Sequence, residues 1–281
     1  MNGPRDLKSL VDELIEEIKR MKSALVAFSG GVDSSTLAAL AYKALGDRAL
    51  AVTINSPLLP HGELDEAVKV ARVIGMRHLV VEFNELELPG FSDNPRGRCY
   101  ICKKARLAVL KDIASREGLK AILDGTTKSD LSDYRPGIRA LIEEGVRSPL
   151  LEAGLSKDKV REIARLLGLP VHNKPPSSCL ATRIPHGQKI TLEKLRRIDL
   201  AERVIKERLG ASLVRVRLHG GDLARIEVDP RERRLFFSEE ALNFIAIEFK
   251  KLGFKIVALD VEGYRAGKVP LEQKAGTGSV L

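Results

Sequence analysis

The most informative stretch of this chain is ALVAFSGGVDSSTLAALAYKAL, residues 24–45. Residues 24–28 are apolar and β-prone, two glycines break the run, and an alanine- and leucine-rich helix is expected up to residue 45. The first backbone N–H groups of a helix have no partner within the helix, and the helix dipole adds partial positive charge there. Gly30 and Gly31 let the main chain approach an anion with no Cβ in the way. The stretch therefore predicts a strand, a tight turn and a helix start that hold phosphate.

The side chains of this turn add polar groups suited to a nucleotide. Three serines supply hydroxyl donors, and Asp33 offers carboxylate oxygen, the ligand that Mg²⁺ prefers. The turn is not a Walker A loop, because no Gly-Lys-Ser or Gly-Lys-Thr follows the glycines. The string SGGVDSS instead resembles the PP-loop of the N-type ATP pyrophosphatases, which release pyrophosphate while they adenylate a substrate. This resemblance implies that Asp33 is catalytic and that ATP with Mg²⁺ is bound by Ser29, Gly30, Gly31, Asp33, Ser34 and Ser35.

The composition is that of a soluble globular protein with enough core for two domains. The chain has 281 residues, of which 44% are hydrophobic and 30% charged. No apolar run reaches the length of a membrane span, and residues 1–21 are a charged amphipathic stretch unlike a signal peptide, so we expect a cytoplasmic protein without a membrane partner. The net charge of +9 suits an anionic ligand, but the absence of Trp and only 4% aromatic residues give little support for a base-stacking nucleic-acid surface. We also expect a homo-oligomer.

Short apolar strands alternate with helices through the first half of the chain. Further strands are expected at 49–54, 78–82 and 121–123, and helices at 5–21, 63–74 and 98–116. This order predicts an α/β fold, a parallel sheet with helices on both faces. Ligands of such sheets bind at the carboxyl ends of the strands, where Thr53 and Gly125 lie, and these two residues are predicted to contact the nucleotide. Asp124 at the same edge is a second candidate for Mg²⁺, although Asp often only caps a turn.

The rest of the chain completes the first domain and then reads as a smaller α+β domain. Residues 128–150 form a polar loop and a short helix, residues 156–167 a helix, and the Pro- and Ser-rich residues 173–178 an interdomain loop. Helices at 192–209 and 239–252 and strands at 213–218, 224–228 and 255–259 precede a basic, Gly-rich tail. The predicted domains are residues 1–176 and residues 177–281.

Three cysteines are the remaining chemical feature. Cys99 and Cys102 form C-x-x-C at the start of the basic helix, where the helix dipole and neighbouring basic residues favour thiolates, and Cys179 follows in the interdomain loop. A zinc site would need a fourth ligand, and a redox pair would leave Cys179 unexplained. A [4Fe–4S] cluster on three thiolates would leave one iron free for substrate or sulfide. The alternative is a chance C-x-x-C with Cys179 as a small buried residue, but the polar flanks of both segments argue against it.

Several motifs together carry a resemblance to one family. They are SGGVDSS, DYRPG at residues 133–137, CLATRIPHG at 179–187, Ala-Glu at 201–202, VRVRLH at 214–219 and ARIEV at 224–228. Over nearly its whole length the chain resembles the LarE-type ATP-dependent sulfur transferases, which mature the nickel-pincer cofactor of lactate racemase. The resemblance implies a PP-loop ATP pyrophosphatase domain followed by a domain for substrate binding and sulfur transfer.

The resemblance also implies the reaction and the groups that bind its substrate. ATP on the PP-loop would adenylate a carboxylate of a pyridinium biscarboxylate mononucleotide, and sulfur would then replace the adenylate. Arg215 and Arg217 alternate to one face of a strand and can converge on one phosphate, which by resemblance is the phosphate of this small nucleotide substrate. Glu202 either orients the substrate or pairs with a basic neighbour, and Arg183 is expected to contact a nucleotide phosphate.

The cysteines place the chain among the branches of the family. In single-cysteine members, the cysteine that matches Cys179 gives up its own sulfur and becomes dehydroalanine. Because Cys99 and Cys102 are present as well, the chain resembles the branch in which three cysteines hold a [4Fe–4S] cluster that carries sulfide. Cys179 is then a catalytic cysteine that is not consumed, and the external partner is sulfide or another sulfur donor. The alternative enzyme is a [4Fe–4S]-dependent tRNA thiolation enzyme, and a non-catalytic nucleotide sensor is the alternative from another class.

Overall fold

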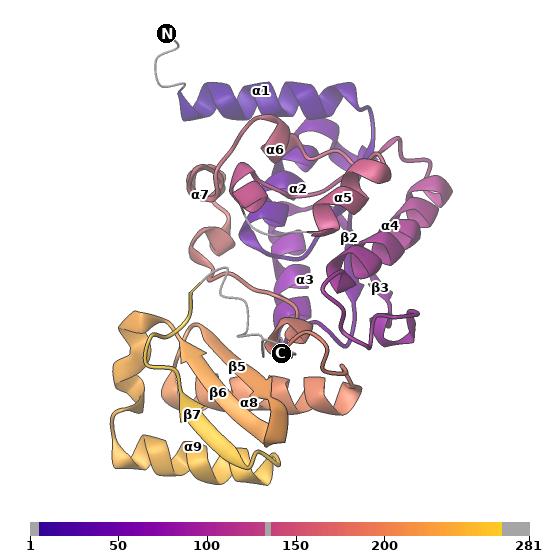
Figure 1. The fold of residues 1–281 in the computed structure, drawn as a ribbon. Coiled ribbons are helices and arrows are strands. Elements are labelled where there is room, and N and C mark those ends of the chain that lie inside the picture. Colours follow the sequence, from indigo (N-terminus) through magenta and orange to yellow (C-terminus); the bar gives the residue numbers. More distant parts are fainter. Residues whose placement is uncertain (1–5, 133–135, 266–281) are drawn as a thin grey trace, which may run out of the picture. The chain divides into compact units, whose positions relative to one another are not determined.

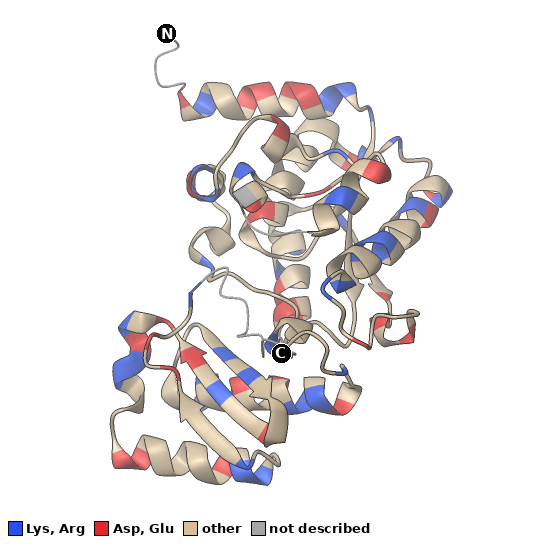
Figure 2. Ribbon diagram, in the orientation of Figure 1, with Lys and Arg blue, Asp and Glu red and all other residues tan. Residues whose placement is uncertain are grey.

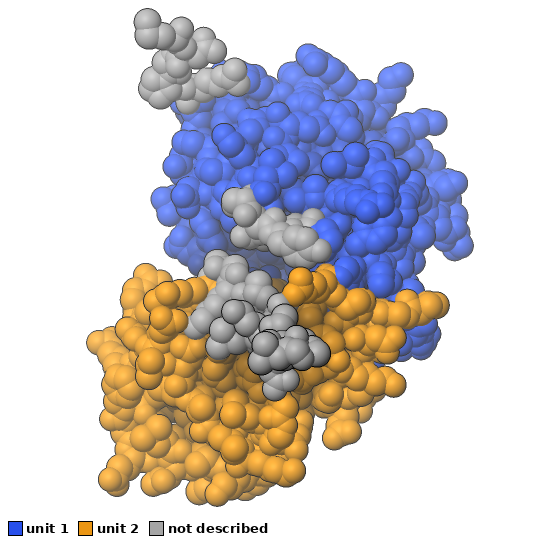
Figure 3. Space-filling model, in the orientation of Figure 1, with its two compact units in different colours: residues 1–88, 97–177 blue, residues 89–96, 178–281 orange. Residues whose placement is uncertain are grey.

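A computed structural model describes residues 6–132 and 136–265, and contacts divide the chain into two units. Unit 1 comprises Met1–Leu88 and Gly97–Ser177, and unit 2 comprises Pro89–Arg96 and Ser178–Leu281 (Figure 3). The sequence predicts one boundary, after residue 176, whereas the short segment Pro89–Arg96 also groups with the C-terminal residues. The first residues of the predicted N-terminal helix, residues 133–135 of the DYRPG motif and the basic tail from residue 266 lie outside the described residues.

The sheet of unit 1 is parallel throughout. Its four strands run in the order β3-β2-β1-β4 (Figure 1). Along the chain, a helix separates each strand from the next. The predicted parallel α/β sheet is confirmed. Its elements are β1 (Ala24–Ala27), α2 (Val32–Leu45), β2 (Ala49–Asn55), α3 (Glu63–Ile74), β3 (Arg77–Glu82), α4 (Arg98–Arg116) and β4 (Ala121–Leu123).

Helices cover both faces of this sheet because both faces of its inner strands are apolar. Ala24 and Val26 of β1 belong to a core with α2, α3, α1 (Leu7–Arg20) and α7 (Lys157–Leu166). Leu25 and the alternate β2 residues Leu50 and Val52 belong to the core on the other face, with α4 and α5 (Pro136–Glu143). Alternate residues of one strand thus enter different cores, as the two-residue period of a strand requires.

The strand order determines where this sheet can bind a ligand. From β1 the chain moves outward in one direction to β2 and β3, and β4 then pairs with the opposite edge of β1. The crevice beyond the carboxyl ends of β1 and β4 is therefore a topological switch point, the place where parallel sheets bind ligands. The short helix α6 (Pro149–Glu152) follows α5 in unit 1.

Unit 2 is a three-stranded mixed sheet with two long helices. β5 (Val214–His219) pairs antiparallel with β6 (Leu223–Val228), and β6 pairs parallel with β7 (Ile256–Leu259). Thr191 caps the start of α8 (Leu192–Leu209), where its hydroxyl accepts from Lys194 N at 3.2 Å, and Ser238 does the same for α9 (Glu239–Lys251). The predicted smaller α+β fold is confirmed. None of the helices in the described ranges combines the length and apolarity needed to cross a membrane.

Candidate active site

The PP-loop closes on itself through its serine hydroxyls. Ser29 N donates to Ser34 Oγ at 3.2 Å, the two hydroxyls lie 3.0 Å apart, and Ser34 Oγ also lies 3.2 Å from Gly31 O. Gly31 N in turn donates to Ser29 Oγ at 3.3 Å. Since α2 begins directly after Gly31, this closed loop fixes the position of the helix N-terminus, where partial positive charge favours an anion.

Glycine is required in the loop for a steric reason. Gly30 has a φ of 69°, in the left-handed region, and a Cβ there would lie 2.6 Å from Ala67 Cα of α3. Across the crevice, a Cβ on Gly125 would lie 3.0 Å from Ser34 N. The loop is thus packed between α3 on one side and the end of β4 on the other, and a side chain at either glycine would displace main-chain atoms.

A cavity of about 280 Å³ opens at the switch point, and four of the predicted nucleotide-binding residues, Ser29, Asp33, Ser34 and Gly125, line it. Ser29, Asp33 and Ser34 line it from the PP-loop, and Asp124, Gly125 and Thr126 line it from the end of β4. A third side is made by α4, the helix that carries Lys and Arg along much of its length (Figure 2). The apolar part of the lining includes Val52, Ile54, Leu107 and Leu110.

The two cations that α4 contributes are held in place by carboxylates. Lys103 Nζ lies 3.0 Å from Asp124 Oδ2, and Asp124 also accepts from Thr126 N at 3.0 Å and from its hydroxyl. Burial opposes ionisation of Asp124, but Lys103 and Thr126 outweigh it, so the pKa of this carboxyl lies below its usual value. Arg106 Nε donates to the buried Glu85 at 2.7 Å. Asp124 is therefore ionised at neutral pH, and the cavity holds charges of both signs.

Thr53 and Ser35 are buried and do not line the cavity. The buried Thr53 hydroxyl donates to Phe28 O at 2.9 Å and lies 2.8 Å from His78 Nε2, so it links β1, β2 and β3 beneath the loop. Burial lowers the pKa of His78. Ser35 is fully buried, and its hydroxyl has no hydrogen-bond partner within the described residues. Nucleotide contacts by these two residues stay predictions.

None of the three cysteines forms a disulfide bond in the described part of the chain. Cys99, which is exposed, and Cys102, which is half-buried, lie in the first turns of α4 in unit 1, and Cys179 lies in unit 2. Tyr100, between the first two, donates to Glu143 of α5 at 2.6 Å. Across residues 6–132 and 136–265, no three His, Cys, Asp or Glu side chains gather as a metal site.

In unit 2, Cys179 is tied to the predicted phosphate-binding residues through its main chain. Cys179 O accepts from Thr182 Oγ1 at 2.8 Å and from Arg183 Nη1 at 3.0 Å. Arg183 is fully buried and pairs with Glu202 at 2.8 and 3.0 Å. Burial disfavours the charge of Glu202, but Arg183 outweighs this and holds the pKa of the carboxyl below its usual value. Glu202 also accepts from Val216 N of β5 at 2.9 Å, so the buried ion pair between Arg183 and Glu202 joins residues 179–183 to the sheet.

Arg215 and Arg217 lie on one face of β5, as their spacing predicts. Arg217 pairs with Glu227 of β6 at 2.9 Å and donates to Thr182 O at 2.8 Å. The Arg215 guanidinium lies 5.4 Å from the centre of the Tyr264 ring, and burial together with the charge of Arg183 lowers its pKa to about 10. The face thus carries three arginines, Arg215, Arg217 and Arg225, and one carboxylate, Glu227, which pairs with Arg217 and Arg225.

Sequence reasoning missed Lys103 and Arg106 as parts of the cavity. Both belong to a helix that the sequence marks only as basic, and their spacing of three residues is the signal that they share a face. It also placed Arg183 at a nucleotide phosphate, whereas in the structure this side chain is enclosed among Glu202, Ser178 and the Cys179 carbonyl.

Comparison with known proteins agrees with this geometry. Residues 5–112 match the family model described as NAD synthase. The chain is 43% identical to an uncharacterized protein of Synechocystis sp. over 94% of this chain and 97% of the relative. It is 36% identical to the pyridinium-3,5-bisthiocarboxylic acid mononucleotide synthase of Lactiplantibacillus plantarum, over 91% and 92%. It is also 32% identical to a glutamine-hydrolyzing GMP synthase polypeptide of Pyrococcus horikoshii, over 72% and 70%.

Proposed function

The chain belongs to the LarE-type family of ATP-dependent sulfur transferases in the PP-loop superfamily, and we propose that it converts a carboxylate of a pyridinium biscarboxylate mononucleotide into a thiocarboxylate. The observation that carries this proposal is the cavity at the switch point, in which a helix N-terminus, Lys103 and Arg106 surround space for a nucleotide. The curated relative named for a bisthiocarboxylic acid mononucleotide supplies the substrate class.

The proposed first step is adenylation, because a carboxylate is a poor electrophile at neutral pH. A carboxylate oxygen of the substrate attacks the α-phosphorus of ATP, the bond to the β-phosphate bridging oxygen breaks, and pyrophosphate leaves. In this proposal the start of α2 and the hydroxyls of Ser29 and Ser34, which line the cavity, would bind the leaving phosphates, and the cations of α4 would offset the charge that develops. Asp33 and Asp124 line the same cavity, so their oxygens fit Mg²⁺, which would neutralise phosphate charge.

In the second step sulfur replaces the adenylate. Hydrosulfide attacks the acyl carbon, a carbon–sulfur bond forms, and AMP leaves with the former carboxylate oxygen. We assign the substrate phosphate to Arg215 and Arg217, on the cationic face of β5, where charge-assisted hydrogen bonds hold phosphate well. Glu202 then acts by holding Arg183 and, through it, the main chain of Cys179.

We further propose that Cys99, Cys102 and Cys179 carry the sulfur as ligands of a [4Fe–4S] cluster. Their chemistry suits this, since thiolates are the usual ligands of such clusters and two of the cysteines lie at a helix N-terminus that favours thiolate. Bound on three thiolates, such a cluster supplies an open iron for sulfide.

The adenylation step is tested with Asp33→Ala. We expect pyrophosphate formation that depends on the pyridinium substrate to fall by about a hundredfold or more. Without the Asp33 carboxylate, Mg²⁺ would no longer be held where it neutralises the charge of the phosphates. Asp47→Ala, at an exposed turn beyond the far end of α2, is the matched control and should keep the rate. Retained activity in Asp33→Ala would refute the role.

Binding of the substrate phosphate is tested with Arg215→Ala. The KM for the pyridinium substrate should rise by roughly tenfold or more, as for the loss of one hydrogen bond to a charged group, with ATP binding intact. Arg203→Ala removes a partly exposed arginine of α8 and is the control. An unchanged KM in Arg215→Ala would remove this assignment.

The cluster is tested by anaerobic purification with iron and sulfide quantitation. About four irons per chain, lost in Cys179→Ala, would support the three-thiolate cluster. A preparation that transfers sulfur without iron would contradict it, and the mass of Cys179 after turnover would then test sacrifice of its sulfur. The tRNA thiolation alternative is not favoured, since the curated relative over nine-tenths of the chain is named for a mononucleotide.

A further inference from the structure

Asn94 makes an unusual set of contacts in unit 2. Its side chain is fully buried, and Nδ2 donates to Ile184 O at 3.3 Å, Pro185 O at 2.8 Å and Gln188 O at 3.0 Å. One amide group therefore holds three backbone carbonyls of a loop about ninety residues further along the chain. Buried carbonyls need such donors, because an unsatisfied one carries the full cost of its desolvation.

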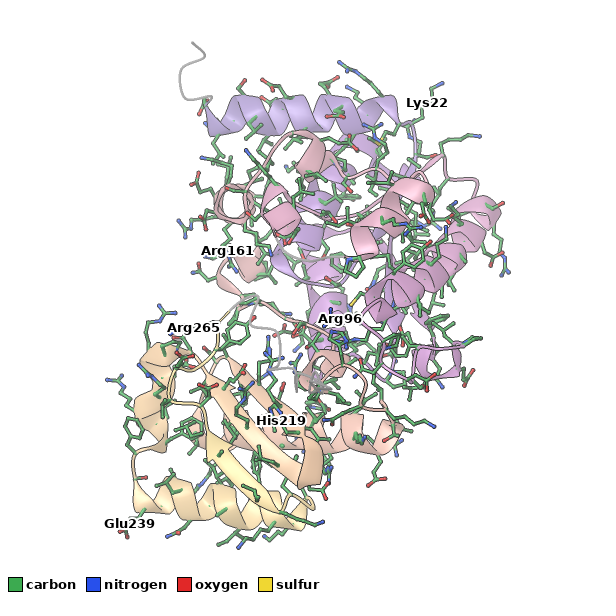
Figure 4. The ribbon with its side chains drawn as sticks, viewed as in Figure 1. Lys22, Arg96, Arg161, His219, Glu239 and Arg265 are labelled. Atoms are coloured by element: carbon green, nitrogen blue, oxygen red, sulfur yellow. The ribbon has the colours of Figure 1, made fainter. Side chains whose placement is uncertain are left out.

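The main chain around Asn94 reinforces this hold. Gly187 N donates to Asn94 O at 3.0 Å, and Ile190 N donates to Ser92 O at 2.8 Å. Asn94 itself has a φ of 58°, in the left-handed region that Asn tolerates better than most residues. These contacts explain why Pro89–Arg96, which ends at the residue labelled Arg96 in Figure 4, groups with unit 2 although its neighbours on both sides belong to unit 1.

The loop that Asn94 holds is continuous with the turn that begins at Cys179. Ile184 N donates to Ala181 O at 3.2 Å and Thr182 N to Cys179 O at 3.0 Å, so the 3₁₀ turn Leu180–Arg183 connects the two ends. Arg183 anchors the first end of this segment to Glu202, and Asn94 anchors the second. Residues 179–188 are thus held by two buried polar side chains, Arg183 near the start and Asn94 near the end.

We propose that Asn94 is a positioning residue for the sulfur-transfer step, acting through the loop that it holds behind Cys179. The inference rests on the proposed role of Cys179 in sulfur transfer. Asn94 lies only five residues before Cys99 in the sequence. The stretch that leads into the C-x-x-C is therefore hydrogen-bonded to the loop that follows Cys179. Adenylation, whose groups lie in the cavity of unit 1, does not depend on this contact.

The test uses Asn94→Asp in the full-length chain. Aspartate has nearly the same shape and tolerates the left-handed backbone, but its carboxylate has no donor and would face three carbonyl oxygens. Asn84→Asp makes the same chemical change ten residues earlier, at a partly exposed asparagine of unit 1 whose oxygen accepts from Leu86 N. At a temperature where both variants are folded, we compare the rates of pyrophosphate formation and of sulfur incorporation into the pyridinium substrate within a single turnover.

We expect Asn94→Asp to keep pyrophosphate formation within about twofold and to lose sulfur incorporation by about tenfold or more, while Asn84→Asp keeps both. Purely structural damage would lower both activities together. In a Cys99→Ser/Cys102→Ser background, where Cys179 is the one thiol of the sequence, its alkylation rate should change several-fold on Asn94→Asp. If Asn94→Asp does not fold, Asn94→Gly replaces it, because glycine keeps the backbone conformation and removes only the side-chain hydrogen bonds. The two activities and the alkylation rate of Cys179 are then measured on Asn94→Gly, with the same expected results.

Cys179→Ala separates the two claims. If it abolishes sulfur incorporation while the Asn94 variants leave incorporation and alkylation unchanged, the positioning role is wrong and the proposed function stands. If Cys179→Ala retains incorporation, the proposed role of Cys179 is wrong, and the positioning inference is overturned with it.

Discussion

Replacement of Gly30 by alanine tests whether the PP-loop owes its position to close packing against α3. The added Cβ would lie 2.6 Å from Ala67 Cα and 2.8 Å from Ala67 Cβ, and both the loop and α3 are main chain that cannot rotate away. The left-handed φ of 69° adds about 1–2 kcal/mol for any residue with a Cβ, and overpacking adds about 1–3 kcal/mol. Gly30→Ala should therefore lower the free energy of unfolding by about 2–5 kcal/mol.

The assay combines thermal unfolding with pyrophosphate formation. A loss of this size corresponds to a fall in Tm of roughly 4–20 °C for a chain of this length. Because the loop must move to relieve the contact, pyrophosphate formation should fall by about tenfold or more at a temperature where the variant is folded. Gly31→Ala is the matched control, since Gly31 has a φ of −80° and its Cβ would meet only Ser29 Oγ at 3.4 Å. Equal Tm values for the two variants would refute the packing argument.

Three further predictions concern other contacts of the structure. Gly125→Ala should raise the KM for ATP by roughly tenfold, because a Cβ 3.0 Å from Ser34 N presses on the start of α2; an unchanged KM would count against the cavity as the ATP site. Glu202→Gln should lower the free energy of unfolding by about 3–5 kcal/mol in a denaturant titration, because the buried Arg183 loses its counter-charge, and a loss below about 1 kcal/mol would contradict that reasoning. Hydrogen bonds from Tyr100, Arg139 and Lys104 together lower the pKa of Glu143 from 4.5 to about 2, so the stabilisation from these bonds should be present above pH 4.5 and lost as the pH falls toward 2. Glu143→Gln should flatten that part of the stability profile, and an unaltered slope would contradict the assignment.

The sequence predicts the long elements of this chain well because their ends carry local signals. Gly75 ends α3 and Gly210 ends α8, both in the left-handed conformation that is typical of a helix C-terminus, and Thr191 caps the start of α8. The parallel order of unit 1 follows from the same alternation of short apolar strands and helices. The PP-loop is a local motif, so its serines and glycines could be placed without knowledge of the rest of the fold.

Long-range contacts were beyond the reach of the sequence. Asn94 meets carbonyls about ninety residues away, and nothing in its flanking residues marks the segment as part of unit 2. Arg106 and Lys103 face the cavity because α4 packs on one side of the sheet, a tertiary fact that charge alone does not show. The pairing of Arg183 with Glu202 was open in the sequence as one of two alternatives for Glu202, and burial of both side chains explains why they meet.

The mass of the product shows whether this chain transfers sulfur to the pyridinium substrate. The purified chain is incubated anaerobically with ATP, Mg²⁺, sulfide and pyridinium biscarboxylate mononucleotide, and product and pyrophosphate are quantified together. We predict that one carboxylate oxygen of the substrate is exchanged for sulfur, and that one pyrophosphate is released for each sulfur that the product gains. Pyrophosphate release with no sulfur in the product, by a preparation with intact iron and sulfide, would contradict it.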